Sequence, residues 1–259
     1  MARSTLKVLV FHWCAAKRLA FVDYALTDER RSVIFAPVRR EEDVLVANRP
    51  NAFDEAFGAQ LRDLLRWRRD VRRFRRDRLP VGTLENLIEL GCLAPSVGLS
   101  QPWRFVVVDD QTLRAEVRQV FASCNAEALA AQSPSRAALY ARLKLAGLEE
   151  APSHLAVFAD RGAEQGHGLG SRTMPEMIEY SVVTAVHTMW LAARAQGIGM
   201  GWISILDPQK VAAVLDVPSD WKFIGYFCFG YPENEGAIPE LEQLGWEERR
   251  PPATFVIRR

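Results

Sequence analysis

The sequence has few cysteines, no long apolar run and almost no net charge. Its four cysteines are widely spaced among 259 residues and form no Cys-x-x-Cys pair, which argues against a disulfide scaffold and a structural zinc site. We therefore expect a reducing, cytoplasmic compartment. No stretch approaches the ~20 apolar residues that span a bilayer, and a net charge of +1 argues against a surface that binds nucleic acid as a whole. We expect neither a membrane nor a nucleic acid as partner.

Several motifs of catalysis and nucleotide binding are also missing. The glycines of Gly197–Ser204 (GIGMGWIS) precede a predicted strand and lack the Gly-x-Gly-x-x-Gly spacing of a dinucleotide site. No Gly-x-Ser-x-Gly elbow of a serine hydrolase occurs. The four histidines are scattered and form no His-Glu-x-x-His pair, so we expect no metal in the site.

The remaining composition is that of a globular protein, with 49% hydrophobic and 25% charged residues. Residues 1–52 show no sustained helical period, and we interpret them as a loosely attached N-terminal extension of a domain over residues 53–259. Helical spacing predicts a long helix over Pro175–Gln196 that is apolar on more than one face, which is typical of a helix buried in a core or a subunit interface. The other predicted helices are Phe53–Trp67, a stripe over Leu84–Cys92, Thr112–Ala131 and Ser135–Glu150. Asp207-Pro208 predicts the start of a further short helix, with Asp as the N-cap and Pro at the first helical position. The predicted strands are Arg104–Val108, Leu155–Ala159, Met200–Ile205 and Phe223–Gly230. Helices and strands interleave, which indicates an α+β or α/β class with helix predominating.

One segment concentrates positive charge. Arg66–Arg78 (RWRRDVRRFRRDR) holds eight arginines and two aspartates in thirteen residues. The planar guanidinium fork binds phosphate well, so this segment suits a phosphorylated ligand. A solvated basic face and a nucleic-acid groove are the alternatives. Asp70 lies inside the run. Its carboxylate is either a hydrogen-bond acceptor for the arginines or a ligand N–H, or a simple charge partner of the arginines.

A second segment, Ala94–Trp103 (APSVGLSQPW), has the composition of an irregular loop between a helix and a strand. Gly98 permits a close approach of the backbone to a ligand, and Ser96 offers a small polar group. An ordinary turn is the alternative. Five of the seven tryptophans fall beside these segments or in the tail, which suits an aromatic-lined pocket as well as a core.

These segments together resemble the nitroreductase-like flavoproteins. The resemblance rests on RRDVRRF (Arg68–Phe74), APSVGLSQPWRFVVV (Ala94–Val108) and GIGMGWISIL (Gly197–Leu206), in that order along the chain. Within the family the chain is most similar to the 5,6-dimethylbenzimidazole synthase branch, through Asp70, KLAGLEEAP (Lys144–Pro152) and PELEQLGW (Pro239–Trp246). The similarity covers about residues 55–250. It implies an α+β fold with a mixed central sheet flanked by helices and one long buried helix.

The resemblance also implies a site for flavin mononucleotide (FMN). Arg68, Arg69 and Arg72 would hold the phosphate, the ribityl chain and the ring edge, and Arg249 would complete the phosphate site. The residues expected along the ring and its surroundings are Asp70, Val71, Ser96, Leu145, Ser181 and Ser204. Asp70 and Ser181 match the two polar residues that the synthase branch needs for chemistry on the flavin, so both are the expected catalytic residues.

The activity that the resemblance implies uses reduced FMN as substrate and O₂ as co-substrate. The product would be 5,6-dimethylbenzimidazole, the lower ligand for cobalamin biosynthesis, formed by oxidative fragmentation and ring contraction of the bound flavin. A flavin reductase would supply the reduced FMN, and the enzyme would be a homodimer. The first alternative is an FMN-dependent NAD(P)H nitroreductase or quinone reductase. The second is a flavin carrier or RNA-binding module built on the arginine run.

Overall fold

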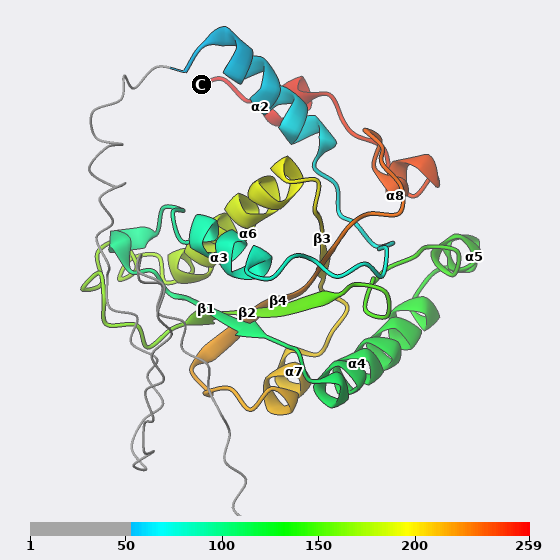
Figure 1. The fold of residues 1–259 in the computed structure, drawn as a ribbon, viewed down its shortest axis with the longest axis horizontal. Helices are drawn as coiled ribbons and strands as arrows, with labels where there is room; N and C mark the ends of the chain where they lie inside the picture. The colour runs from blue at the N-terminus through cyan, green and yellow to red at the C-terminus, as the bar shows by residue number, and fades with distance from the viewer. Residues whose placement is uncertain (1–52) are drawn as a thin grey trace, which may run out of the picture. The chain divides into compact units, whose positions relative to one another are not determined.

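A computed structural model describes residues 53–259 of the chain, so the expected extension over residues 1–52 lies outside the described residues. A four-stranded sheet forms its centre (Figure 1). The strands follow the order β1 (Trp103–Val107), β2 (Ser153–Asp160), β4 (Trp221–Gly230) and β3 (Gly199–Ile203). Helices are the major element around it, which confirms the predicted α+β class.

The sheet differs from the expected mixed sheet in one respect. All three neighbouring strand pairs run antiparallel. Parallel pairing is limited, among residues 53–259, to an isolated bridge between Asp70 and Met200. Interleaved helices and apolar strands are typical of parallel sheets, but a long helical connection also leads into an antiparallel neighbour, and the sequence pattern does not distinguish the two cases.

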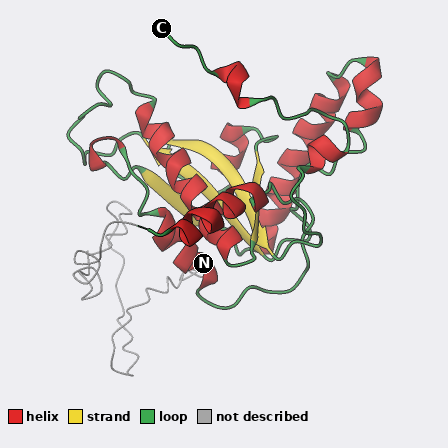
Figure 2. Cartoon of the chain, turned by 90° about the horizontal axis from the view of Figure 1, so that it is seen from above, coloured by secondary structure: helices red, strands yellow, loops and turns green. Residues whose placement is uncertain are grey.

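Helices cover both faces of the sheet (Figures 1 and 2). On one face α3 (Thr83–Gly91) and α6 (Met177–Ala195) share a core with Leu155, Val157 and Phe227 of the central strands. On the other face α4 (Gln111–Ala130) and α7 (Pro208–Val214) pack against the alternate strand residues, including Ala156, Phe158 and Tyr226. The alternation follows from the two-residue period of a strand, and it explains why β2 reads as a continuous apolar run.

The long helix α6 starts two residues later than predicted and ends at Ala195, with Gly197 in a left-handed conformation just beyond it. Its inward face is fully buried at Val182, Ala185, Val186 and Met189. The opposite face is exposed, which differs from the expectation of a helix buried nearly all round. The exposed positions on that face are Tyr180, Val183, Thr184 and His187.

Shorter elements complete the domain. α2 (Glu55–Trp67) begins at Asp54, whose carboxylate accepts a hydrogen bond from the Phe57 amide, and it buries none of its residues. Two further short helices are α5 (Pro134–Tyr140), which follows α4, and α8 (Glu240–Gln243), which follows β4. Two short 3₁₀ turns, η1 and η2, span Val97–Leu99 and Pro252–Phe255.

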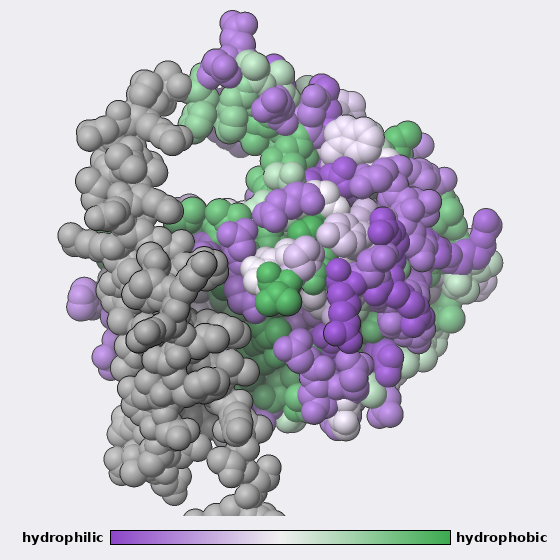
Figure 3. Space-filling view, in the orientation of Figure 1, coloured by the Kyte–Doolittle hydropathy of each residue, from purple (hydrophilic) through white to green (hydrophobic). Residues whose placement is uncertain are grey.

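The apolar side chains of α2 form a surface patch. Hydrophobic atoms gather over this helix in the space-filling view (Figure 3). The exposed large residues here are Phe53, Phe57, Leu61, Leu65 and Trp67. Within residues 53–259, no helix is long and apolar enough to cross a membrane.

Candidate functional site

The arginine-rich segment leaves α2 and runs along β3. The Val71 amide donates to the Met200 carbonyl over 3.1 Å, beside the Asp70–Met200 bridge. A Cβ on Gly201 would lie 2.1 Å from the Val71 carbonyl oxygen, which is far inside van der Waals contact. Gly201 is therefore required by a close approach of two backbones, and this contact places residues 68–72 at the strand.

Each carboxylate oxygen of Asp70 accepts at least one hydrogen bond. Oδ1 accepts a hydrogen bond from the Trp202 amide at 2.9 Å. Oδ2 accepts from Nε of Arg72 at 2.9 Å and forms an ion pair with its terminal nitrogen at 2.8 Å. Arg72 also donates to the Lys144 carbonyl over 3.3 Å. A carboxylate with three donors is strongly held, yet Oδ1 has only one of them and keeps capacity for a further donor.

The charges of Arg68, Arg69 and Arg249 act on one another beside this carboxylate. Burial lowers the pKa of Arg68, Asp70 raises it and Arg249 lowers it further. Burial likewise lowers the pKa of Arg69, with Arg249 and Arg68 adding to the effect. An anion bound beside these arginines would offset the repulsion between their like charges.

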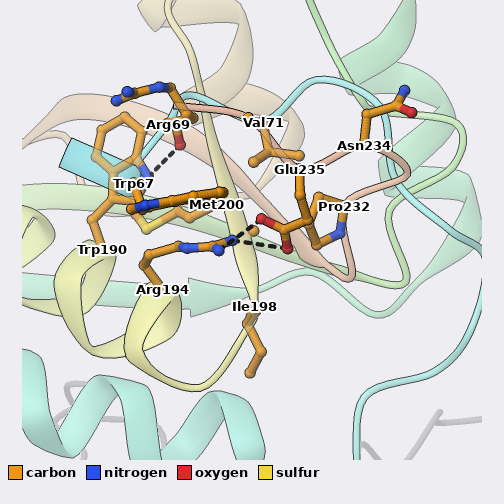
Figure 4. Close-up of a pocket in the computed structure, with 12 residues that line it drawn as sticks. Trp67, Arg69, Val71, Trp190, Arg194, Ile198, Met200, Pro232, Asn234 and Glu235 are labelled. Atoms are coloured by element: carbon orange, nitrogen blue, oxygen red, sulfur yellow. Dashed lines mark hydrogen bonds and ion pairs between the residues drawn. The ribbon is translucent and has the colours of Figure 1, made fainter. Parts of the chain in front are cut away.

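An indole and a pocket border the arginine cluster. The Arg68 guanidinium lies 4.7 Å from the centre of the Trp190 ring, and Nε1 of Trp190 donates to the Arg69 carbonyl over 3.1 Å. Arg69 lines a pocket whose wall includes an ion pair of Arg194 with Glu235, at 2.6 Å between the closest atoms (Figure 4). Nε of Arg69 is buried and has no hydrogen-bond partner within residues 53–259, so a donor here is available for a ligand.

Ser181 and Ser96 belong to a different part of the molecule. The Ser181 hydroxyl donates to the Met177 carbonyl over 2.6 Å and accepts from the Val97 amide at 3.0 Å. The Ser96 hydroxyl accepts from the Gln101 amide at 3.1 Å. Ser181 precedes Trp190 by nine residues, which is ~13 Å along a helix. Within one chain the structure therefore separates these serines from the arginine cluster, and the single Ser181 hydroxyl proton is already used inside α6.

The two remaining expected residues flank the Asp70 contacts. Leu145 is half-buried and follows Lys144, whose carbonyl accepts the hydrogen bond from Arg72. Ser204 is exposed and lies just after the end of β3, two residues beyond Trp202. The sequence analysis missed the Trp202 amide as a partner of Asp70, because a backbone donor leaves no signal in the residue type.

Residues 65–231 match the model of the nitroreductase family. The chain belongs to the nitroreductase family. It is 56% identical over 207 residues to the 5,6-dimethylbenzimidazole synthase of Rhodospirillum rubrum, covering 80% of this chain and 97% of that enzyme. It is 43% identical over 199 residues to the 5,6-dimethylbenzimidazole synthase of Rhodobacter capsulatus, covering 77% and 96% of the two chains.

Solved structures agree with the family assignment. A crystal structure of an iodotyrosine deiodinase bound to FMN and 3-iodo-L-tyrosine superposes with a TM-score of 0.58 at 27% identity, covering 68% of this chain and 91% of that one. The resemblance found in the sequence is thereby confirmed at the level of the family and of the synthase branch.

Proposed function

We propose that this chain is a 5,6-dimethylbenzimidazole synthase, which converts reduced FMN and O₂ to the lower ligand of cobalamin. The observation that carries the proposal is the 56% identity over 97% of the length of the Rhodospirillum rubrum synthase. The alternative of a plain nitroreductase or quinone reductase has weaker support, since the NADH dehydrogenase of Thermus thermophilus is 30% identical over 179 residues.

The arginine cluster fits the phosphate of FMN. Burial lowers the pKa of Arg68 and of Arg69, and the like charge of Arg249 adds to the lowering at both; a phosphate dianion would offset both effects. The unpartnered Nε of Arg69 supplies a further donor. Bound reduced FMN supplies the electrons that O₂ takes up and the ring atoms of the product. The protein's own part is to hold the flavin, exclude water and place proton acceptors.

Asp70 is the residue that we propose for acid–base work or for anchoring the ring. Arg72 covers Oδ2 with two nitrogens, whereas Oδ1 meets only the Trp202 amide. Oδ1 is therefore the atom that can accept an N–H or a proton from a ligand. For Ser181 we propose a positioning role, because its hydroxyl holds the Val97 amide of the loop that carries Ser96.

Identifying the reaction product tests the proposed function against the alternative. Reduced FMN is mixed with the enzyme without oxygen, O₂ is then admitted, and the products are analysed by mass spectrometry. The synthase gives 5,6-dimethylbenzimidazole without any other substrate. Oxidation of NAD(P)H coupled to reduction of a quinone or nitro compound, with no benzimidazole formed, would establish the alternative instead.

Removing Arg249 should weaken the binding of FMN and leave riboflavin binding unchanged. A charge-assisted hydrogen bond contributes about 1.5–3 kcal/mol, so Arg249→Ala should raise the dissociation constant of FMN by ~10- to 100-fold. Arg68→Ala should act in the same direction. Flavin fluorescence titration with FMN and with riboflavin, which lacks the phosphate, measures both effects. Arg78→Ala, an exposed arginine of the same run, is the control, and an equal loss for both flavins in Arg249→Ala would place the phosphate elsewhere.

We also propose a homodimer, in a cytoplasm where a flavin reductase supplies reduced FMN. The support is the exposed stripe of Tyr180, Val183 and His187 on α6 together with the apolar patch over α2. A second copy would bury both. Sedimentation at micromolar concentration should give the dimer mass. A Val183→Glu variant should shift it to the monomer, and a parent protein that sediments as a monomer would contradict the proposal.

A further inference from the structure

Residues 144–150 belong to the connection from α5 to β2 and contain no helix or strand (Figure 1). We call them the 144–150 loop. The Lys144 carbonyl of this loop accepts the hydrogen bond from Nη1 of Arg72 at 3.3 Å. A second contact follows three residues later, because a Cβ on Gly147 would lie 2.4 Å from the Phe74 ring and 3.2 Å from the Arg72 carbonyl oxygen. The loop therefore packs against the arginine-rich segment at two points.

An ion pair joins the two ends of the 144–150 loop. Nζ of Lys144 lies 2.8 Å from Oε1 of Glu150, and the two side chains are only 28% and 21% exposed. Beside the pair, the Ala151 amide donates to the Gly147 carbonyl over 3.1 Å. A link between two residues that are six positions apart restricts the backbone between them. The pair thus limits the positions that the Lys144 carbonyl can take.

Stability alone does not account for the ion pair of Lys144 with Glu150. Oε2 of Glu150 is buried and has no hydrogen-bond partner within residues 53–259. A buried acceptor without a partner lowers the stability of the fold, and an apolar pair of similar size is often as stable as a buried ion pair. We expect such a pair where it specifies the position of neighbouring groups.

The neighbouring group here is the guanidinium of Arg72. Its side chain is only 15% exposed, and both Nε and Nη2 contact Oδ2 of Asp70. The contact of Nη1 with the Lys144 carbonyl is the third point at which the guanidinium is held. A planar group held at three nitrogens cannot turn toward Oδ1 of Asp70 without losing a contact. The Lys144 carbonyl therefore keeps Arg72 on Oδ2 and away from Oδ1.

We propose that Glu150 is a positioning residue, which holds the 144–150 loop through Lys144 so that Arg72 stays on Oδ2 of Asp70 and Oδ1 stays open to the flavin. The inference rests on the proposed function, in which Asp70 acts on the flavin. The atom that touches Arg72 belongs to the backbone of the loop. Any pair of side chains that joins positions 144 and 150 in the same way therefore has the same effect.

The flavin-free protein tests directly whether Glu150 holds Arg72. The Nε–H signal of Arg72 is identified in a ¹H–¹⁵N spectrum by its absence in Arg72→Lys. In the parent protein this proton should exchange slowly with water, because it is bonded to Asp70 in a largely buried side chain. Glu150→Ala should speed the exchange about tenfold, since the guanidinium loses one of its hydrogen bonds. Glu149→Ala, which removes the exposed carboxylate of the preceding residue, is the matched control and should leave the exchange unchanged.

Product formation tests the consequence for the reaction. Glu150→Ala should lower the rate of dimethylbenzimidazole formation at saturating reduced FMN about tenfold, whereas Glu149→Ala should keep the rate of the parent. The reversed pair, Lys144→Glu with Glu150→Lys, joins the ends of the loop again and should restore both the slow exchange and most of the rate. In an Arg72→Met background, Glu150→Ala should add no further loss of rate, because the loop has no guanidinium to hold.

Three results would overturn the inference. They are an unchanged exchange of the Arg72 proton in Glu150→Ala, a further loss of rate in the Arg72→Met background, and a folded reversed pair that leaves the exchange fast. Each would mean that Glu150 only stabilises the fold. A parent protein that forms no dimethylbenzimidazole would contradict the proposed function, while the exchange of the Arg72 proton would still show whether Glu150 holds that side chain.

Discussion

Asp70→Asn should lower the rate of dimethylbenzimidazole formation by ~10²- to 10⁴-fold, or about 3–5 kcal/mol of barrier. The substitution keeps the shape of the side chain and an oxygen that can accept from the Trp202 amide, but it removes the negative charge and the proton-accepting capacity. Binding of FMN should change far less, because the proposed phosphate contacts come from Arg68, Arg69 and Arg249. Single-turnover assays with reduced FMN and O₂ separate the two quantities.

A matched control lies seven residues further on. Asp77 also pairs with an arginine two residues away, since Nε of Arg75 lies 2.8 Å from its carboxylate. That pair is exposed, with about half of each side chain accessible to solvent. Asp77→Asn should therefore leave turnover unchanged. If Asp70→Asn forms product at the rate of the parent enzyme, Asp70 is only a charge partner of Arg72.

Local sequence signals predicted the elements around the site well. Asp207 accepts hydrogen bonds from the Gln209 and Lys210 amides, and Pro208 begins α7, as the Asp-Pro pair predicts. The long apolar period predicted α6 within two residues at its start and one at its end. Capping and periodicity act over a few residues, and they can therefore be read from a single sequence.

Features set by distant contacts were not predictable in this way. The helix expected over Ser135–Glu150 ends at Tyr140, and residues that follow press against the arginine-rich segment: a Cβ on Gly147 would lie 2.4 Å from the Phe74 ring. Strand direction in the sheet is likewise a property of pairing between segments. In the site, the arginine run and Asp70 were visible in the sequence, whereas the separation of Ser181 from them depends on how α6 is placed.

We expect a buried polar pair, His154 of β2 and Tyr226 of β4, to lower the stability of the domain in acid. His154 is 1% exposed, and its Nε2 lies 3.2 Å from the Ala151 carbonyl, which requires a proton on Nε2. Nδ1 then accepts from the Tyr226 hydroxyl at 3.0 Å. Burial lowers the pKa of His154 to about 3, and the neighbouring charge of Arg114 adds to the effect. The imidazole is therefore neutral in the folded protein over a wide range of pH.

The free energy of unfolding should therefore decrease as the pH is lowered. In the unfolded chain histidine takes up a proton near pH 6.5, whereas the folded domain does so only near pH 3. The unfolded state thus binds one more proton between these values, and the free energy of unfolding decreases by about 1.4 kcal/mol per pH unit as the pH drops through this window. The loss is about 2 kcal/mol between pH 7 and pH 5, where the imidazole of the unfolded chain takes up its proton ahead of the carboxylates, and about 4 kcal/mol by pH 3.

Urea unfolding followed by circular dichroism at pH 7, 6 and 5 measures this slope. His154→Gln keeps an acceptor for the Tyr226 hydroxyl and cannot titrate, so its free energy of unfolding should be lower at pH 7 but nearly constant down to pH 5. His167→Gln alters an imidazole of the loop between β2 and α6 that is not buried, and it should retain the slope of the parent. A His154→Gln variant that loses stability between pH 7 and pH 5 as steeply as the parent would assign the acid sensitivity to other groups and leave His154 as a packing residue.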